Sequence, residues 1–403
     1  MITAVLMAPM QVKQQLNIGN LYDLLLCDFY TKCLRMRNME CFFPLMINVN
    51  GSPIEKIVSV SYAQEGDYYR IATDMINRVA IDCKRFSIQY DTILRDDDNV
   101  EEIYALLPKL GVHSVVYCTA CGSVYGSDLS IRFCRRCGQK TEVNLRETFA
   151  KNVVSSDILK KISTVYFAQP SAKLRLTDFV NSLPDNYDII LEKDRKYTAR
   201  INGVGIDPRY AAISLLSTAR KRCPVPRKIV HIHGDVVKKF TYYVLAYLSD
   251  EDIPDVDVMH GNIVDVEHKK LRNCDANGRL DASSLGLNNK EFRAMLLSSS
   301  AKSDIVIDYN IASQRREALV KTYVLMSRVC DNRNFIPGTI GLSAEFDKSL
   351  KNFYAAVDNW NLPKAFEIVN RLVRECWAKT KNLMLSEEEV KIIKSLQAIY
   401  FGD

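Results

Sequence analysis

The sequence contains no run of 18 or more apolar residues, and this absence excludes a helix that spans a membrane. Internal repeats and low-complexity tracts are also absent. The net charge is only +6, which permits a phosphate-bearing partner but is far below the charge density of an obligate nucleic-acid binder. The apolar segment 1–7 has no basic flank and is too short for a secretory signal, so we expect a buried strand there.

Histidine is scarce, with five in the whole chain. His231 and His233 are two residues apart on one predicted strand, so their side chains share a face. We expect a pair of satisfied strand histidines, with metal ligation as the alternative. The histidines at positions 113, 260 and 268 have no ligand spacing, and no Ser-His-Asp or Cys-His arrangement can be read from the sequence order.

The rest of the composition is typical of a globular protein, with 47% hydrophobic and 25% charged residues. A length of 403 residues suggests two to four structural units. Twelve cysteines without a secretory leader indicate a reducing, cytoplasmic compartment.

Four of the cysteines form two Cys-x-x-Cys pairs, separated by twelve residues. They are Cys118, Cys121, Cys134 and Cys137. This spacing predicts a tetrahedral zinc site, which is closed and structural because all four ligands are protein thiolates. The alternatives are two disulfides or buried spare cysteines, but the other eight cysteines show no pairing pattern.

The first fifty residues predict one β-loop-α-β unit, with strands at 1–8 and 41–47 and a helix that begins at Leu21. The segment 17–20, with Gly19 between small polar residues, lies where a helix N-terminus would offer backbone amides to a phosphate. Asn20 as a plain helix cap is the alternative.

Farther along the chain we expect strands at 187–191 and 228–233 and a helix at 240–248. The sequence after Lys269 is mostly helical. Helices at 347–358 and 364–379 form a hairpin around the turn 361–363, and a last helix begins at Ser386 with a capping box to Glu389.

With these landmarks in this order, the chain resembles the class I aminoacyl-tRNA synthetases, and most closely the methionyl-tRNA synthetase family. Six segments match that family's motifs in order: Asn17-Ile18-Gly19-Asn20 for HIGH, Met36-Arg37-Asn38-Met39 for Met-Arg-Gly, Ile47-Asn48-Val49-Asn50-Gly51 for Asp-Glu-His-Gly, Val204-Gly205-Ile206-Asp207 for Val-Trp-Leu-Asp, His231-Ile232-His233-Gly234-Asp235 for His-x-x-Gly-Lys-Asp, and Lys269-Lys270-Leu271-Arg272-Asn273 for KMSKS.

The resemblance implies an α/β fold: a Rossmann-like catalytic domain with a zinc-knuckle insertion and a C-terminal helical bundle. The implied parts are the first catalytic half (1–100), the insertion (101–155), the second catalytic half (156–260), the KMSKS-like and stem-contact region (261–335) and a truncated anticodon-domain-like bundle (336–403).

The chemistry that the family implies is attack of a carboxylate on the α-phosphate of ATP, which gives an acyl-adenylate and pyrophosphate. Such a site needs hydrogen-bond donors and cations. The resemblance also implies that ATP binds as its magnesium complex. The matching catalytic residues are Asn17, Asn20, Lys269 and Arg272, and the matching ATP-binding residues are Gly19, Gly234 and Asp235. The alternative for Lys269 and Arg272 is a solvated basic turn.

The substrate pocket departs from the family pattern. Asn48 stands where the family has the acid that holds the substrate ammonium, Gly205 where it has an aromatic wall, and Phe240 where it has a histidine, while Asp207 is kept. Ordinary methionine activation is therefore not expected. The helices from Ala344 onward leave too little chain for a complete anticodon-reading domain, so specific tRNA recognition is not expected either.

Three functions follow from the resemblance. The first is an ATP-dependent ligase that activates a non-standard amino acid or other carboxylate and transfers it to an amine, hydroxylamine or carrier, in natural-product biosynthesis. The second is a catalytically degenerate paralogue with a binding or regulatory role, which the loss of both HIGH histidines favours. The third is tRNA aminoacylation with altered specificity.

Overall fold

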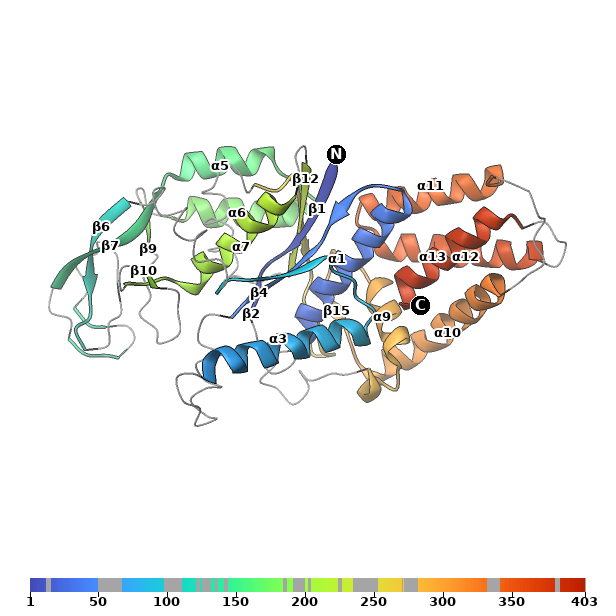
Figure 1. Cartoon of the computed structure of the whole chain (residues 1–403), viewed down its shortest axis with the longest axis horizontal. Helices are drawn as coiled ribbons and strands as arrows, with labels where there is room; N and C mark the ends of the chain where they lie inside the picture. Colours follow the sequence, from blue (N-terminus) through green and yellow to red (C-terminus); the bar gives the residue numbers. More distant parts are fainter. Residues whose placement is uncertain are drawn as a thin grey trace.

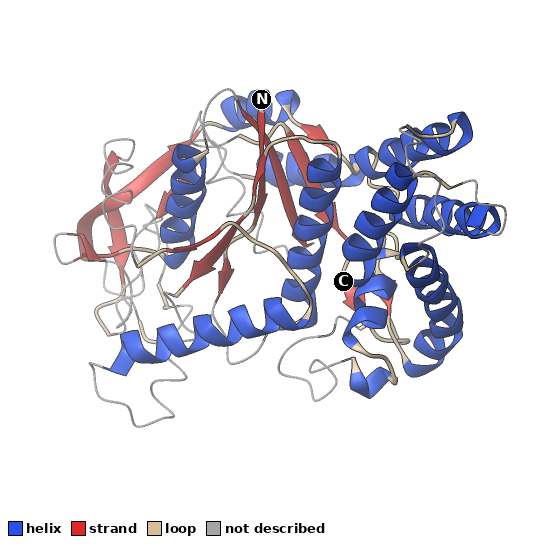
Figure 2. Ribbon diagram, turned by 45° about the vertical axis from the view of Figure 1, so that its right-hand side comes forward, coloured by secondary structure: helices blue, strands red, loops and turns tan. Residues whose placement is uncertain are grey.

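The structure is a computed structural model of the whole chain, shown in Figures 1 and 2. It describes residues 1–11, 16–49, 67–97, 111–120, 124, 132–134, 137–140, 144–183, 187–190, 200–201, 204–223, 227–234, 253–269, 271, 282–331, 341–380 and 385–402.

The centre of the molecule is a five-stranded parallel sheet with the order β3-β1-β12-β13-β8. Its strands are β1 (Ile2–Met7), β3 (Cys41–Phe42), β8 (Tyr166–Phe167), β12 (Arg227–Gly234) and β13 (Val256–His260). The apolar sequence of β1 is buried on both faces, as a central parallel strand requires. The predicted strands at 1–8 and 228–233 are therefore confirmed, and they pair directly.

The predicted strand at 41–47 is in fact two strands in different sheets. After β3, the chain enters β4 (Pro44–Asn48), which lies between β2 (Met10–Gln11) and β5 (Thr92–Arg95) in a second parallel sheet. Pro44 has no N–H to donate to a ladder, and Phe43 instead exchanges hydrogen bonds with Asp91. The continuous apolar run gave no sign of this break.

The third large sheet is antiparallel and lies at the end of the molecule opposite the C-terminal helices (Figure 1). It consists of β6 (Gly111–Tyr117), β7 (Asn144–Val153) and β9 (Tyr187–Ile190). The strand predicted at 187–191 is present as β9, but it joins this sheet and not the central one. Two short pairs complete the strands: β10 (Arg200–Ile201) with β11 (Val204–Gly205), and β14 (Ile263–Val264) with β15 (Ile305–Val306).

The helices of the α/β part surround these sheets. They are α1 (Ile18–Met36), α3 (Asp67–Arg85), α5 (Ser155–Thr164), α6 (Pro170–Asn181) and α7 (Pro208–Arg222). The helix predicted at 240–248 lies outside the described residues. Among the described residues, every helix is too short or too polar to cross a membrane.

The C-terminal part is helical, as the sequence predicted. Its elements are the short 3₁₀ helix η3 (Ser283–Leu285), α9 (Asn289–Leu297), α10 (Tyr309–Cys330), α11 (Ala344–Asp358), α12 (Leu362–Thr380) and α13 (Glu387–Phe401). Helices α11 and α12 form the predicted hairpin. The capping box of α13 is also confirmed, since Ser386 Oγ accepts from the Glu389 N–H and Glu389 accepts from the Ser386 N–H.

Helix α1 joins this bundle to the central sheet, because it contacts β1 and β12 as well as α9 and α13 (Figure 1). At its C-terminal end Arg37 donates to both carboxylate oxygens of Asp358, at 2.9 and 3.0 Å, and lies over the ring of Tyr354. Asn38 then has φ +56°, a left-handed conformation that Asn tolerates and that glycine would supply in a Met-Arg-Gly segment.

A buried arginine forms the second connection. Arg293 of α9 donates to the carboxylate of Asp28 in α1, to Phe86 O after α3, and twice to Ile399 O in the last turn of α13. Lys32 completes the network with a 2.9 Å contact to Asp28. The guanidinium group of α9 therefore binds α1, α13 and the segment that follows α3.

Candidate nucleotide-binding site

The predicted phosphate-binding segment is placed at the carboxyl end of the central strands. The chain leaves β1 at Met7 and returns as α1, so the N-terminus of α1 lies near the edge where β12 and β13 also end. In open parallel sheets, this edge is where ligands bind. The unpaired amides and positive partial charge of the first helical turn suit an anion there.

Asn17, and not Asn20, caps this helix. The Oδ1 atom of Asn17 accepts from the Asn20 N–H at 2.6 Å, and α1 begins three residues earlier than the apolar spacing predicted. The alternative reading of Asn20 as the cap is therefore wrong. The cap uses the oxygen of the Asn17 amide, while its nitrogen remains a donor by chemistry. Gly19 is half-buried, and a Cβ there would lie 3.3 Å from Asn17 Oδ1.

Gly234 and His260 end the neighbouring strands β12 and β13 in register. A Cβ on Gly234 would lie 3.0 Å from Cε1 of His260, so the imidazole packs directly on the glycine backbone. The Nε2 atom of His260 lies 2.7 Å from Asp23 Oδ1 in α1, and Nδ1 lies 2.7 Å from Gly261 O. The sequence gave no sign of this pair, because 237 positions separate its two members.

The other two histidines of this region lie on β12 and share a face, as predicted. The rings of His231 and His233 are 5.5 Å apart, and His233 Nε2 lies 3.1 Å from Asp257 Oδ1 on β13. Residue alternation places this pair on the opposite face of the strands from Gly234 and His260. Arg175 of α6 contacts Met259 on that face.

A tight turn follows β14 and ends at Lys269, the first residue of the KMSKS-like segment. Asp265 Oδ1 accepts from the backbone amides of Glu267 and Lys269, both at 2.9 Å, and the Leu271 N–H returns to Ile263 O at 3.0 Å. The Lys269 side chain is exposed and pairs with Glu267 in the same turn. Arg272 lies outside the described residues, as do Asp235 and Phe240.

Two of the predicted substrate residues, Asn48 and Gly205, are the last residues of strands outside the central sheet. Asn48 is buried as the last residue of β4, and the next amide, that of Val49, donates to the buried Asp96 at 2.7 Å. Gly205 of β11 pairs with Arg200 of β10, and the buried Asp207 directly precedes α7.

Three cysteines of the predicted zinc motif come together in the structure. The Sγ atoms of Cys118, Cys134 and Cys137 lie within 4.8 Å of one another, and those of Cys118 and Cys137 are 3.7 Å apart. Four thiolates 2.3 Å from one zinc ion would be about 3.8 Å apart, and the distance between the Cys118 and Cys137 sulfur atoms is close to this value. The Cys137 N–H points to Cys134 Sγ at 3.4 Å, and Gly138 turns the chain with φ +73°. Cys121 lies outside the described residues.

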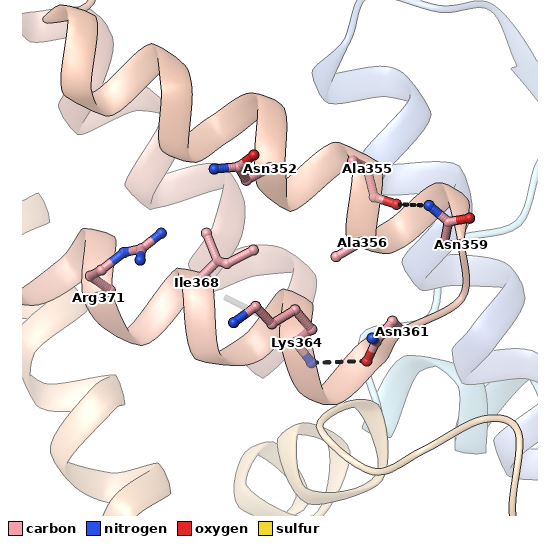
Figure 3. Close-up of a pocket in the computed structure, with 8 residues that line it drawn as sticks. All are labelled: Asn352, Ala355, Ala356, Asn359, Asn361, Lys364, Ile368 and Arg371. Atoms are coloured by element: carbon pink, nitrogen blue, oxygen red, sulfur yellow. Dashed lines mark hydrogen bonds between the residues drawn. The ribbon is translucent and has the colours of Figure 1, made fainter.

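A cavity of about 600 Å³ lies between α11 and α12, in the helical bundle (Figure 3). It is lined by Asn352, Ala355, Ala356, Asn359, Asn361, Lys364, Ile368 and Arg371. The polar side chains of this lining are amides and two cations, and Lys364 pairs with Glu367 at 3.0 Å.

Comparison with solved structures identifies the architecture. The chain aligns over 99% of its length with Mycobacterium tuberculosis methionyl-tRNA synthetase in complex with methionyl-adenylate, with a TM-score of 0.69 and 14% sequence identity, and covers 88% of that chain. The fold is similar to that of methionyl-tRNA synthetases. The ligand-free form of the same enzyme also aligns with 99% of this chain, at 14% identity and with a TM-score of 0.64, and the alignment covers 86% of the enzyme chain. The comparisons with protein-family models and with curated proteins found no match to the chain.

Proposed function

We propose that this protein is an ATP-dependent, adenylate-forming ligase of the synthetase type. The observation that carries the proposal is the alignment of 99% of the chain with a structure that holds methionyl-adenylate. The position of the α1 N-terminus at the carboxyl edge of the central sheet supports it, because that is where the fold would present amides to ATP.

The proposed reaction joins a carboxylate oxygen to the α-phosphorus of ATP and breaks the bond from that phosphorus to the bridging oxygen, so that pyrophosphate leaves. Negative charge grows on phosphate oxygens during this step. The first-turn amides of α1, the amides of Asn17 and Asn20, and the cations of Lys269 and Arg272 are the proposed donors. Gly19, Gly234 and Asp235 are the proposed ATP contacts, and the nucleotide enters as its magnesium complex.

The proposed acyl substrate is a non-standard amino acid or a carboxylate without a free α-amine. Asn48 is buried at the end of β4 and carries no charge with which to hold an ammonium group. Gly205 supplies no aromatic wall, and Phe240 cannot replace a hydrogen-bonding histidine. Asp207 is the proposed polar contact that remains in this pocket.

The proposed acceptor is an amine, a hydroxylamine or a carrier, in specialised biosynthesis. The net charge of +6 is small for a protein that must grip a whole tRNA. An assay of mobility shift with total tRNA at low salt tests this part, since a stable shift would favour the alternative of tRNA aminoacylation with altered specificity.

We further propose that Cys118, Cys121, Cys134 and Cys137 hold a structural zinc ion that staples the insertion 101–155. Three of the four sulfur atoms lie within 4.8 Å of one another, and this grouping is compatible with a shared zinc ion. A closed set of four thiolates has no open position for a substrate, so the ion would supply stability and no chemistry.

Carboxylate-dependent exchange between ATP and pyrophosphate tests the ligase. We expect exchange with at least one member of a panel of amino acids and other carboxylates, and a loss of about 10-fold or more with Lys269→Ala. Lys364→Ala is the matched control, because it too removes an exposed lysine that pairs with a nearby glutamate. Exchange that is equal in both variants would contradict the role of Lys269.

The competing function is a catalytically degenerate paralogue that binds a partner or a nucleotide. The contact of Lys269 with Glu267 favours it, because this cation already has an anionic neighbour in its own turn. ATP binding without exchange for any carboxylate would support this second function over the first.

A further inference from the structure

We propose that the turn between two of the clustered cysteines is a contact site for a single-stranded nucleic acid, in which a base stacks on Phe133 while Arg132 and Lys140 bind the neighbouring phosphates. We call residues 132–134 and 137–140 the cysteine turn. It belongs to the connection from β6 to β7, strands of the sheet that lies opposite the C-terminal helices (Figure 1). The inference goes beyond the proposed ligase and does not depend on it, because it uses no residue of the proposed ATP site or substrate pocket.

Backbone hydrogen bonds fix the cysteine turn. The Cys134 N–H donates to Gln139 O at 2.7 Å, and the Gly138 N–H donates to Cys134 O at 2.8 Å. Phe133 and Lys140 are directly opposite each other across this turn, in an antiparallel bridge. Side chains opposite each other on antiparallel strands lie on one face, with Cβ atoms about 5 Å apart. The turn therefore holds an aromatic ring and an ammonium group on the same face.

The alternation of side chains separates this face from the thiols. Cys134 is 2% exposed, and its sulfur atom groups with those of Cys118 and Cys137. Phe133, the residue before it, is 63% exposed, because neighbouring residues of an extended segment point to opposite sides. The buried Cys134 anchors the backbone, so the ring of Phe133 is already held outward before a ligand arrives.

An exposed apolar side chain alone would not indicate a ligand. Tyr69 and Leu174 are 65% and 63% exposed, and single apolar residues of this kind are normal on protein surfaces. What distinguishes Phe133 is its position between two cations. Arg132 precedes it in the sequence, and Lys140 faces it across the turn. A ring for stacking and two groups that can bind phosphate therefore lie within one short turn.

Both cations are available to an anion. Within the described residues, the side chains of Arg132 and Lys140 make no ion pair and no hydrogen bond. Exposed lysines elsewhere, such as Lys321 and Lys351, pair with an acid one helical turn away. Between Cys118 and Lys140 the sequence has four basic residues and one acidic residue, so this stretch supplies a net charge of +3 in a chain whose net charge is +6. A negatively charged ligand is therefore attracted to this part of the molecule.

The combination defines the chemical class of the ligand. Every base has a flat π face that can stack on an exposed aromatic ring, and the strand that carries the base has phosphates on either side. An acidic peptide would satisfy Arg132 and Lys140, but its carboxylates cannot stack on Phe133. In a duplex the bases already stack on one another, so the ring has no base face to contact. A single-stranded segment of a few nucleotides fits both features.

Fluorescence anisotropy with the whole protein and a labelled RNA of eight cytidines tests the proposal. This probe contains no adenine that could enter the proposed ATP site. We expect Phe133→Ala to weaken binding by about 10-fold, because the stacking of one base is lost. Phe133→Leu should weaken it as much, and Phe133→Trp should bind at least as tightly as the wild type. Tyr69→Ala is the matched control, since it removes an equally exposed aromatic ring from α3 and should leave the affinity unchanged.

The salt dependence of binding tests the cations separately. Each phosphate that is neutralised on a single strand contributes about −0.7 to the slope of log affinity against log salt concentration. Arg132→Gln and Lys140→Gln should each make the slope shallower by about 0.7, whereas Phe133→Ala should leave it unchanged. Lys364→Gln is the control, because this exposed lysine belongs to α12 and pairs with Glu367.

The remaining measurements separate a lost contact from a damaged fold. Metal content and thermal unfolding are measured for every variant, and we expect both to match the wild type because the substituted side chains are exposed. Phe133→Leu against Phe133→Trp decides the case in which Phe133→Ala unfolds, since both keep a large apolar side chain and only one keeps a ring. Equal affinity of these two variants would overturn the proposal. It would also be overturned if the wild type bound an RNA duplex or a peptide of eight glutamates as tightly as the eight cytidines.

Discussion

Arg293 is expected to hold the helical bundle on the α/β part, and Arg293→Met tests this directly. The substitution keeps an unbranched apolar stem but removes the guanidinium group, which is 1% exposed. Asp28, whose side chain is fully buried, then loses one cation, and Phe86 O and Ile399 O lose their donors. Ile399 O belongs to the last turn of α13, where carbonyls have no partner within the helix.

The magnitude follows from the burial of the partner that remains. Removing one member of a buried ion pair costs about 3–5 kcal/mol, because the other charge stays in the interior. Lys32 offsets part of this loss. Burial, followed by the charge of Arg293, lowers the pKa of Lys32, so the substitution strengthens the remaining contact of Lys32 with Asp28. We therefore expect a loss near the lower limit, at about 3 kcal/mol.

Urea unfolding measures this loss as a lower midpoint at an unchanged slope. Lys351→Met is the matched control, since its exposed contact with Asp347 should contribute less than about 1 kcal/mol. If Arg293→Met also cost less than about 1 kcal/mol, the reasoning that assigns this hub to Arg293 would be refuted.

Three further predictions concern Glu389 in the helical bundle, Cys134 in the predicted zinc site and Gly261, which follows β13. Burial raises the pKa of Glu389, but hydrogen bonds from Ser343 and its other partners outweigh this effect and lower the pKa below 4.5. We therefore expect the wild type to be more stable than Glu389→Gln by roughly 1 kcal/mol above pH 4.5. Urea titrations should show that this difference vanishes as the pH falls below 4.5. We expect the wild type to hold one zinc ion per chain by elemental analysis, and Cys134→Ser should release it. The melting temperature of this variant should be no lower than that of the wild type treated with a chelator. A metal-free wild type would contradict this prediction. Gly261→Ala would place a Cβ 2.2 Å from Ser303 O, so we expect a loss of more than about 1 kcal/mol in chemical unfolding, and a neutral effect would show that the close approach is absent.

Local features of the structure could be predicted from the sequence. The helices of the hairpin follow from apolar residues at helical spacing, and the start of α13 follows from the Ser386–Glu389 capping box. The cysteine spacing likewise fixed which sulfur atoms would meet, and Cys118, Cys134 and Cys137 do so. Each of these predictions depends on side chains that are close in sequence or on a strict ligand spacing.

Long-range features could not be predicted in the same way. Neither Asp23 nor His260 belongs to a recognisable pattern in its own segment. The two side chains meet only because the fold places the end of β13 beside α1. Arg293 reads as one charge on an amphipathic helix, although it is buried between α1, α3 and α13. The sheet that β9 joins is also set by tertiary contacts, because the sequence pattern of a short apolar strand does not indicate which strand it pairs with.

In the proposed reaction, an oxygen atom of the carboxylate becomes bonded to the α-phosphorus of ATP. Isotopic labelling of that oxygen tests the reaction most directly. A carboxylate that supports pyrophosphate exchange is labelled with ¹⁸O and incubated with the protein, magnesium-ATP and hydroxylamine as acceptor. The account predicts one ¹⁸O atom in the AMP that is released, because the adenylate breaks at the acyl carbon. Label in inorganic phosphate together with ADP, or AMP without label, would contradict it.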